Sequence, residues 1–431
     1  MKVMTRRALL GGVVGALAVS PFIIKHFRKT TPLPEGYVDT FPRAIDPSIV
    51  PSGKVDVVYD PVTFVPLTLP SEGIISWTQN AVLSNDNKWL LVSHCFGDDC
   101  QSQICYAPLD KSGLPETFVK LKDFGPKSVV TGLGCSSLDN RTGGRLSCRL
   151  QKFEEQKPDD GGITFSLSLV CADLQTKGKT LEHSSESVVL RKDEFPAKSW
   201  GPLPVGQYNH RWLEGQNAFL AVLGFNTRQD LYRVDCEDND KDNRLQVLRP
   251  LKNGDLHRDI GSNLFLDDKT ITFLEAPMRL RGKDEKWNGA IDSYRTDPDG
   301  LLVSLNLDGT TNSEKSFPVP LYSYLRKTLI TKTHCFFRSI PSGQFFVIAS
   351  FEKPQDYIKL GFALDEIQLP DSGINYIFEP LLILPSGRHL LCARDVGNVF
   401  VKKAQELGLP LSTRDYRTSL QSRLECIRLA F

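Results

Sequence analysis

The sequence predicts an all-β protein. Short apolar runs alternate with turns rich in Asn, Asp, Pro, Ser and Gly, residues that preset or permit the backbone angles of turns. One pattern, an apolar strand, a polar turn and a second apolar strand, recurs at Val82–Ser93, Leu264–Phe273, Phe337–Ser350 and Leu382–Cys392. A pattern that recurs along one chain indicates a repeat architecture.

A second pattern alternates with the first and consists of a strand that ends in a polar turn. Its copies are Ile104–Gly113, Leu169–Gly178, Leu231–Asp238 and Leu302–Gly309, and successive copies begin 65, 62 and 71 residues apart. Two hairpins per repeat make a four-stranded antiparallel sheet, the blade of a β-propeller. Residues 71–431 hold about six such blades, or seven, because the boundaries near 310–340 and after 395 are blurred. A pair of β-sandwiches is the alternative.

Two segments carry a family resemblance. Ser84–Ser93 resembles the Ser-Pro-Asp-Gly-Lys hairpin of TolB-like and WD40-like propellers, and Leu302–Gly309 resembles their outer hairpin with its Asp-Gly turn. The likeness extends over most of the chain but is degenerate in every copy. It implies the architecture and not the chemistry, since propellers include binding scaffolds and many kinds of enzyme.

The composition agrees with a folded protein that does not bind nucleic acid. Hydrophobic residues make up 40% of the chain and charged residues 24%, which is a globular profile. The 52 basic residues are balanced by 51 acidic ones. A nucleic-acid binder would need an excess of positive charge to neutralise phosphates.

The N-terminus predicts export. Lys2, Arg6 and Arg7 precede an apolar run over residues 8–24, which is the pattern of a signal sequence. Thr5–Leu10 resembles the twin-arginine signal, and a general secretory signal with two arginines is the alternative. Residues 1–29 are therefore expected to direct the chain to the periplasm or cell envelope. If uncleaved, they would form a single-pass anchor, the only membrane contact expected, since 17 apolar residues lie at the low end of a span of about 17–25. Residues 30–70 are a lead-in segment with a candidate ring-closing strand.

Ten cysteines also agree with an oxidising compartment. Cys135 and Cys148 lie symmetrically about the turn at residues 139–144, so we expect them to form a disulfide across one hairpin. Cys95 and Cys105 flank a second loop in the same way. Metal binding by that cluster with His94 is the alternative, but its spacing does not match the short Cys knuckles of structural zinc sites. No Gly-x-Ser-x-Gly or phosphate-binding glycine motif follows a strand.

The candidate site comes from position in the repeat. The link that enters each blade should cross one mouth of the central channel, and polar groups that converge there are what a ligand site requires. Satisfied polar residues at strand starts are the alternative. The residues predicted at this mouth are Gln79, Tyr208, His210, Arg211, His257, Arg258, Asp259, Lys332, His334, Tyr376 and Glu379.

Two functions follow from this site. The first is an exported binding scaffold that holds a peptide, a glycan or a partner protein, because loops on a rigid frame commonly carry recognition. The second is a metal-assisted lyase or hydrolase that acts on an acidic sugar, with a divalent ion bound by His210, His257 and His334. Asp259 or Glu379 would then be the fourth ligand or the base, and Arg211 and Arg258 would hold the carboxylate of the substrate. No other cofactor is expected.

Overall fold

The structure is a computed structural model, and it describes nineteen segments of the chain. They are residues 54–56, 61–64, 76–96, 101–139, 141–153, 165–191, 209–225, 228–237, 244–250, 258–261, 263–267, 269–280, 294–296, 299–319, 328–338, 345–354, 357–361, 378–395 and 422–428. All helix and strand assignments in these segments are β-strands, β1 to β27. Within them, no helix has the length and apolar character that crossing a membrane requires. The predicted signal at residues 1–29 lies outside these segments.

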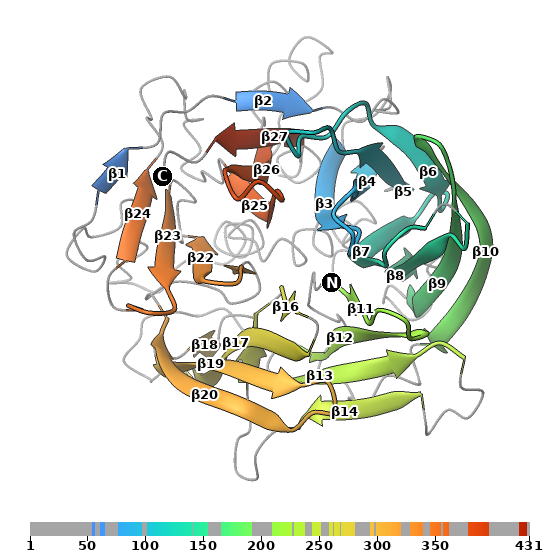
Figure 1. Cartoon of the computed structure of the whole chain (residues 1–431). Helices are drawn as coiled ribbons and strands as arrows, with labels where there is room; N and C mark the ends of the chain where they lie inside the picture. Colours follow the sequence, from blue (N-terminus) through green and yellow to red (C-terminus); the bar gives the residue numbers. More distant parts are fainter. Residues whose placement is uncertain are drawn as a thin grey trace, which may run out of the picture.

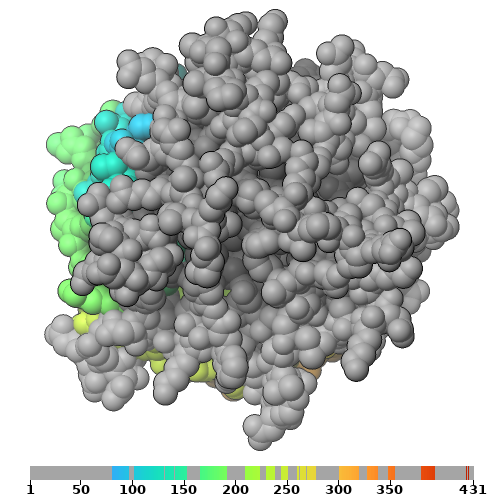
Figure 2. Space-filling model, turned by 180° about the vertical axis from the view of Figure 1, so that it is seen from behind, coloured from blue at the N-terminus to red at the C-terminus, as the bar shows by residue number. Residues whose placement is uncertain are grey.

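The first two sheets are regular antiparallel blades. Strands follow one another in sequence order in both, from the channel to the rim. The first blade contains β3 (Ser76–Leu83), β4 (Trp89–Phe96), β5 (Gln101–Pro108) and β6 (Val119–Asp123). The second contains β7 (Ser128–Cys135), β8 (Gly144–Phe153), β9 (Phe165–Lys177) and β10 (Thr180–Arg191). The outer strand β10 is mostly exposed. The part of the sequence that contains it, coloured green, lies at the rim when the molecule is seen from behind (Figure 2).

A ten-stranded sheet follows and contains two four-strand units. One unit, the third of the molecule, is β11 (Arg211–Trp212), β12 (Ala218–Phe225), β13 (Arg228–Asp235) and β14 (Leu245–Arg249). The other, the fourth, is β16 (Phe265–Leu266), β17 (Thr270–Leu280), β19 (Asp299–Asn306) and β20 (Thr311–Pro318), with β15 (Arg258–Ile260) and β18 (Tyr294–Thr296) paired to β17. Arg228 of β13 pairs in parallel with Arg258 of β15, and this pair joins the two units.

The last two sheets combine strands from both ends of the chain. One contains β21 (Leu329–Ile330), β22 (His334–Arg338), β23 (Phe345–Ser350) and β24 (Tyr357–Gly361), with β1 (Lys54–Asp56) added in parallel to β24. The other contains β25 (Phe378–Ile383), β26 (His389–Asp395) and β27 (Ser422–Arg428), with β2 (Pro61–Phe64) antiparallel to β27 as its fourth strand.

The sheets lie around one central axis, so the fold is a β-propeller (Figure 1). The described strands form five sheets, fewer than the six or seven blades that the repeat spacing predicts. The difference arises in the ten-stranded sheet, where a parallel residue pair joins two units that each have the strand order of a blade. The described strands thus make six four-strand units in five sheets, and these units are numbered one to six in chain order from β3 to β27.

The repeated patterns match these units with one exception. The copies at Val82–Ser93, Leu264–Phe273 and Leu382–Cys392 form the first hairpin of a unit, whereas Phe337–Ser350 joins β22 to β23 and forms the second. The four copies of the second pattern begin in β5, β9, β13 and β19, the third strand of each unit. Gly113 and Gly309 follow two of these strands with φ of 78° and 87°, angles that favour glycine.

The core lies between the blades. In β4, Trp89 and Leu91 pack with the second blade, whereas Leu90 and Val92 pack with the last one. A strand buried on both faces needs apolar residues at successive positions, because neighbouring side chains point to opposite faces. The continuous apolar run after each turn is therefore the consequence of packing between two neighbouring blades.

The predicted Cys135–Cys148 disulfide is wrong. Both thiols are free and buried in the core between the first two blades. The register pairs Cys135 with Leu146 and Leu133 with Cys148, after an irregularity in β7. The two cysteines are thus diagonal neighbours, about 7–8 Å apart, whereas a disulfide usually joins Cα atoms about 4.4–6.8 Å apart.

Candidate functional site

The channel holds a cavity of about 580 Å³. Most of its lining residues belong to the inner strands, to the residues just before them and to the turns that follow them, in five of the six units. Residues that line it include Ser84, Asn85, Arg211, Glu214, Asn263, Asp267, Thr331 and Leu384. Inner strands of a closed ring run side by side around the axis, so residues far apart in sequence meet here. The cavity therefore lies at the end of the channel where the first hairpin of each of these units turns.

A belt of buried amide side chains crosses the wall of this cavity. Asn209 Nδ2 donates to the carbonyl oxygen of Ala81 at 2.9 Å and to Asn263 Oδ1 at 3.1 Å. Asn263 Nδ2 donates to the carbonyl oxygen of Thr328 at 3.2 Å. These bonds connect the first, third, fourth and fifth units. Buried amides require such partners, and the belt therefore holds the units in place around a polar wall.

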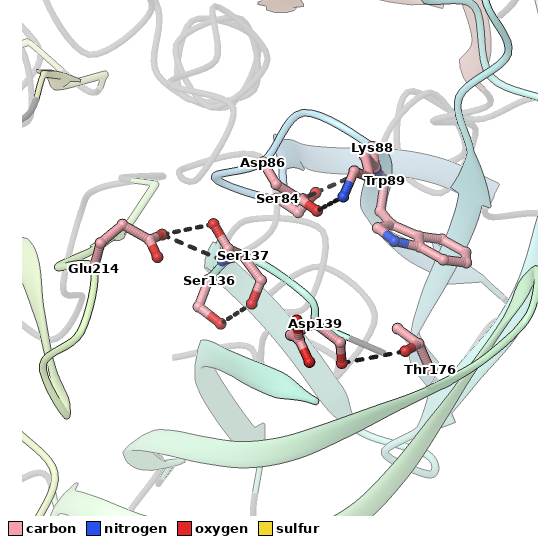
Figure 3. A network of polar contacts seen from close by, with 9 residues as sticks. All are labelled: Ser84, Asp86, Lys88, Trp89, Ser136, Ser137, Asp139, Thr176 and Glu214. Atoms are coloured by element: carbon pink, nitrogen blue, oxygen red, sulfur yellow. Dashed lines mark hydrogen bonds and ion pairs between the residues drawn. The ribbon is translucent and has the colours of Figure 1, made fainter. Parts of the chain in front are cut away.

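The rim of the cavity has a second polar network between blades (Figure 3). Glu214, which follows β11, accepts hydrogen bonds from Ser137 Oγ at 2.9 Å and from Asn85 Nδ2 at 2.6 Å. Asn85 Nδ2 also donates to the carbonyl oxygen of Trp212 at 2.8 Å. The charge of Glu214 is thus compensated by donors from the first two blades.

The turns at the rim are fixed by their own side chains. In the first blade, Ser84 Oγ accepts from the Trp89 amide at 3.1 Å and donates to Asp86 Oδ1 at 2.6 Å. In the fourth unit, Asp267 Oδ1 accepts the backbone amides of Lys269 and Thr270 at 3.0 and 2.7 Å. These backbone bonds lower the pKa of Asp267 from its ordinary value. The side chains of Asp86 and Asp267 therefore stabilise the turns to which they belong.

Among the described residues that line the cavity, Arg211 is the one with a positive charge. Its Nε donates to the carbonyl oxygen of Leu264 at 2.9 Å, which joins the third unit to the fourth. Among the described residues, no carboxylate forms an ion pair with it. Burial lowers the pKa of Arg211 from its ordinary value, because a charged group loses hydration there. The guanidinium is thus a partly desolvated cation with donor capacity left over in a cavity.

His210, predicted beside Arg211 at the mouth, lies instead between the second and third units. Its ring is stacked on Phe219 with centroids 5.1 Å apart, and its Nδ1 lies 3.0 Å from Ser147 Oγ. Gly134 allows this close approach, because a Cβ there would lie 2.6 Å from the Cβ of His210. Desolvation, together with the charge of Arg149, lowers the pKa of His210 to about 3. The imidazole is therefore a neutral core group.

Other predicted site residues lie in several places. Lys332 is exposed in the turn between β21 and β22, and His334 begins β22, with Nδ1 2.8 Å from Thr333 Oγ1. Both follow the inner strand of their unit rather than precede it, because the copy at Phe337–Ser350 is a second hairpin. The backbones of Gln79, Arg258, Asp259 and Glu379 belong to β3, β15 and β25. Tyr208, His257 and Tyr376 lie outside the described residues.

The predicted metal site has little support from the histidines that the structure describes. His210 is packed between blades, and His334 lies in a surface hairpin. In the described segments, no group of three or more His, Cys, Asp or Glu side chains is arranged to hold a metal ion. The third predicted ligand, His257, is outside these segments.

Sequence reasoning missed most of the cavity. It selected the links that enter each blade and treated the repeated turns as structural only. Asn85 and Glu214 directly follow the residue that opens the first turn of their units, and Asp267 is itself the residue that opens the first turn of its unit. The signal was present, because every first hairpin places a polar turn after an inner strand. A second signal of the cavity wall was an asparagine at the same distance from two of these turns. Asn209 and Asn263 each lie four residues before the residue that opens the first turn of their unit.

Comparisons with known proteins found only distant likenesses among solved structures. No protein-family model matches the chain, and no curated protein sequence does. A mutant of Trypanosoma rangeli sialidase with trans-sialidase activity has a TM-score of 0.44 and 10% identity, over 88% of this chain and 60% of that one. An oligogalacturonate lyase in complex with manganese has a TM-score of 0.40 and 10% identity, over 88% and 98%.

A third solved structure is the β-propeller domain of the trilobed protease from Pyrococcus furiosus. Its TM-score is 0.32 at 9% identity, over 74% of this chain and 79% of that one. Each of these likenesses is low, and none of them carries a conclusion about what this chain does. Since one fold supports many functions, what this chain does depends on the residues of its own channel.

Proposed function

We propose that the protein is a binding scaffold whose channel cavity holds a ligand with a carboxylate group. Arg211 is the observation that carries this proposal. A partly desolvated cation without a carboxylate partner is costly, and an anionic ligand would offset that cost. The remaining guanidinium donors suit a planar carboxylate, which can accept two parallel hydrogen bonds.

The rest of the cavity supports a polar ligand of modest size. Asn85, Asn209 and Asn263 line one part of the wall, and the leucines of the inner strands line another. Apolar walls with a few placed polar groups are typical of small-molecule sites. Glu214 and Asp267 also line the cavity, and the hydrogen bonds that they accept from their neighbours partly offset their negative charge. An acidic sugar and a peptide C-terminus both supply this carboxylate chemistry.

The test is equilibrium binding to the full chain by calorimetry. The probes are a uronic acid oligomer, its neutral hexose counterpart, and a short peptide with a free or amidated C-terminus. We expect one carboxylate probe to bind, and Arg211→Ala to weaken it by about 10- to 100-fold, as for a hydrogen bond to a charged group. Arg211→Lys should retain part of the affinity, because it keeps the charge and loses the planar pair of donors.

A matched control is Arg141→Ala, which removes an exposed arginine from a hairpin tip outside the cavity. It should leave binding unchanged. Equal binding of carboxylate and neutral probes, or equal losses in the Arg211 and Arg141 variants, would sink the proposal. The two carboxylate probes also distinguish an acidic sugar from a peptide as the natural source.

Export remains part of this proposal. Arg6 and Arg7 before an apolar run, and the ten cysteines, support a periplasmic or envelope location. A fusion of residues 1–35 to a reporter that is active only outside the cytoplasm tests it. We expect activity from the native segment, and loss on Arg6→Lys with Arg7→Lys if the twin-arginine route is used. A reporter that stays inactive with the native segment rejects export.

A further inference from the structure

Two cysteines from neighbouring units meet in the core. Cys171 lies in β9 of the second blade, and Cys236 directly follows β13 of the third unit. Their Sγ atoms are 3.2 Å apart, closer than ordinary van der Waals contact for atoms of this size. The residues are 65 positions apart in sequence, so only the packing of the two units brings them together.

Both backbones are held by their own sheets. Cys171 pairs with Ser147 on one side and Ser187 on the other. The amide of Cys236 donates to the carbonyl oxygen of Asn217 at 2.9 Å, which ties it to the turn of the first hairpin in its unit. A shift of about 1 Å would bring the sulfurs to the bonded distance of about 2.05 Å. Each cysteine of the pair is therefore held in position by the hydrogen bonds of its own sheet.

The two thiols differ in access. Cys171 is 2% exposed in the apolar cluster between the units, whereas Cys236 is partly exposed at its edge. The hydrogen bond with Cys236, and then burial, raises the pKa of Cys171 well above its ordinary value. An external reagent would therefore reach Cys236 first, and Cys171 would react only with its neighbour.

We propose that Cys171 and Cys236 form a disulfide that links the second and third units. The oxidant is an external disulfide, either a small molecule or a thiol oxidoreductase. The thiolate of Cys236 attacks one sulfur of that disulfide and releases the first thiolate. The thiolate of Cys171 then attacks the Sγ of Cys236 and releases the second. The cysteines lose two electrons and two protons, and the external disulfide becomes two thiols.

The link would lie beside a polar groove between the same two units. This groove has a volume of about 560 Å³, and Asp173, Asn217 and Glu237 line it. Arg145 also lines it and lies 3.3 Å from Asp173 and 3.7 Å from Glu237. Since Glu237 follows Cys236 directly and Asp173 is two residues after Cys171, the disulfide would hold both walls of the groove at a constant separation.

The test uses the purified full chain, reduced and then treated with oxidised glutathione. Free thiols are alkylated, and the protein is digested without reductant and mapped by mass spectrometry. We expect a linked peptide pair containing Cys171 and Cys236. Recovery of both residues in alkylated form, or a link of either one to a different cysteine, would overturn the proposal. This measurement does not depend on the channel ligand or on export.

Variants give a second readout. Oxidation should raise the melting temperature of the wild type by on the order of 5 °C, because a link across a long loop restricts the unfolded chain. The rise should vanish in Cys236→Ala, which removes the more accessible thiol. It should persist in the matched control Cys148→Ala, which lies in the cluster between the first two blades. A rise that persists in Cys236→Ala would contradict the proposed link.

Discussion

At the scale of single residues, the protein keeps two histidines neutral in its core. His94 and His210 are 1% and 3% exposed, and desolvation lowers the pKa of each to about 3. In the unfolded chain the same imidazoles have a pKa of about 6.5. The unfolded state therefore binds more protons below pH 6.5, and stability falls as the pH drops from there toward 3.

This difference predicts a steep pH dependence. Between pH 7 and pH 5, each of these histidines should lower the free energy of unfolding by about 2 kcal/mol. His210→Gln removes one titrating group, so the variant should lose about 2 kcal/mol less than the wild type over the same range. Denaturant unfolding at the two pH values measures both losses. Parallel curves for wild type and variant would show that His210 is not held neutral.

At the scale of elements, a buried ion network joins the third and fourth units. Arg249 of β14 lies 2.5 Å from Glu275 of β17 and 2.7 Å from Glu314 of β20. The side chains of Arg249 and Glu275 are only 8% and 7% exposed. Because these strands belong to different units, the network adds side-chain contacts to the single parallel pair that makes the two units one sheet.

Removing one member of this network should be costly. Arg249→Ala breaks the buried ion pair with Glu275, and breaking a buried pair by removing one member typically costs about 3–5 kcal/mol. The double change Arg249→Met with Glu275→Leu removes both charges and should cost much less. The matched control is the exposed pair Lys177–Glu182, 2.6 Å apart, where Lys177→Ala should cost about 1 kcal/mol or less. Chemical denaturation compares all three, and equal losses in Arg249→Ala and Lys177→Ala would contradict the prediction.

At the scale of the whole molecule, the ring joins both ends of the described chain. β2 supplies the fourth strand of a sheet whose other three strands come from residues 378–428, and β1 adds to β24 of the preceding unit. Closure of this kind removes exposed strand edges. The segment before the first blade is thus part of the propeller.

Truncation tests the contribution of this segment. A chain that begins at residue 66 lacks β1 and β2, whereas one that begins at residue 52 retains both. We expect the shorter chain to melt on the order of 5 °C lower and to self-associate, since β24 and β27 become edges. Scanning calorimetry and size-exclusion chromatography measure the two effects. Equal melting temperatures and monomeric behaviour of both chains would show that the strands add nothing to stability.

The sequence by itself determined the local structure of this protein, its strands and turns. Strands, hairpins and a repeating four-strand unit were predicted from three kinds of local signal: the turn at Ser84–Trp89, the glycines at 113 and 309, and the run of successive apolar residues after each first turn. These signals can be read from the sequence because turn chemistry and alternation are properties of short segments. The repeat pattern also placed Arg211 in a link expected at the channel mouth. These expectations depended on no contact between distant parts of the chain.

Only the tertiary structure decided which side chains meet. It separated Cys135 from Cys148 through the register of β7 and brought Cys171 beside Cys236 through the packing of two units. It made His210 a neutral core group and left Arg211 without a carboxylate partner among the described residues. Register and blade packing depend on the sum of many contacts between units, and a shift of one residue moves a side chain to the opposite face of its sheet.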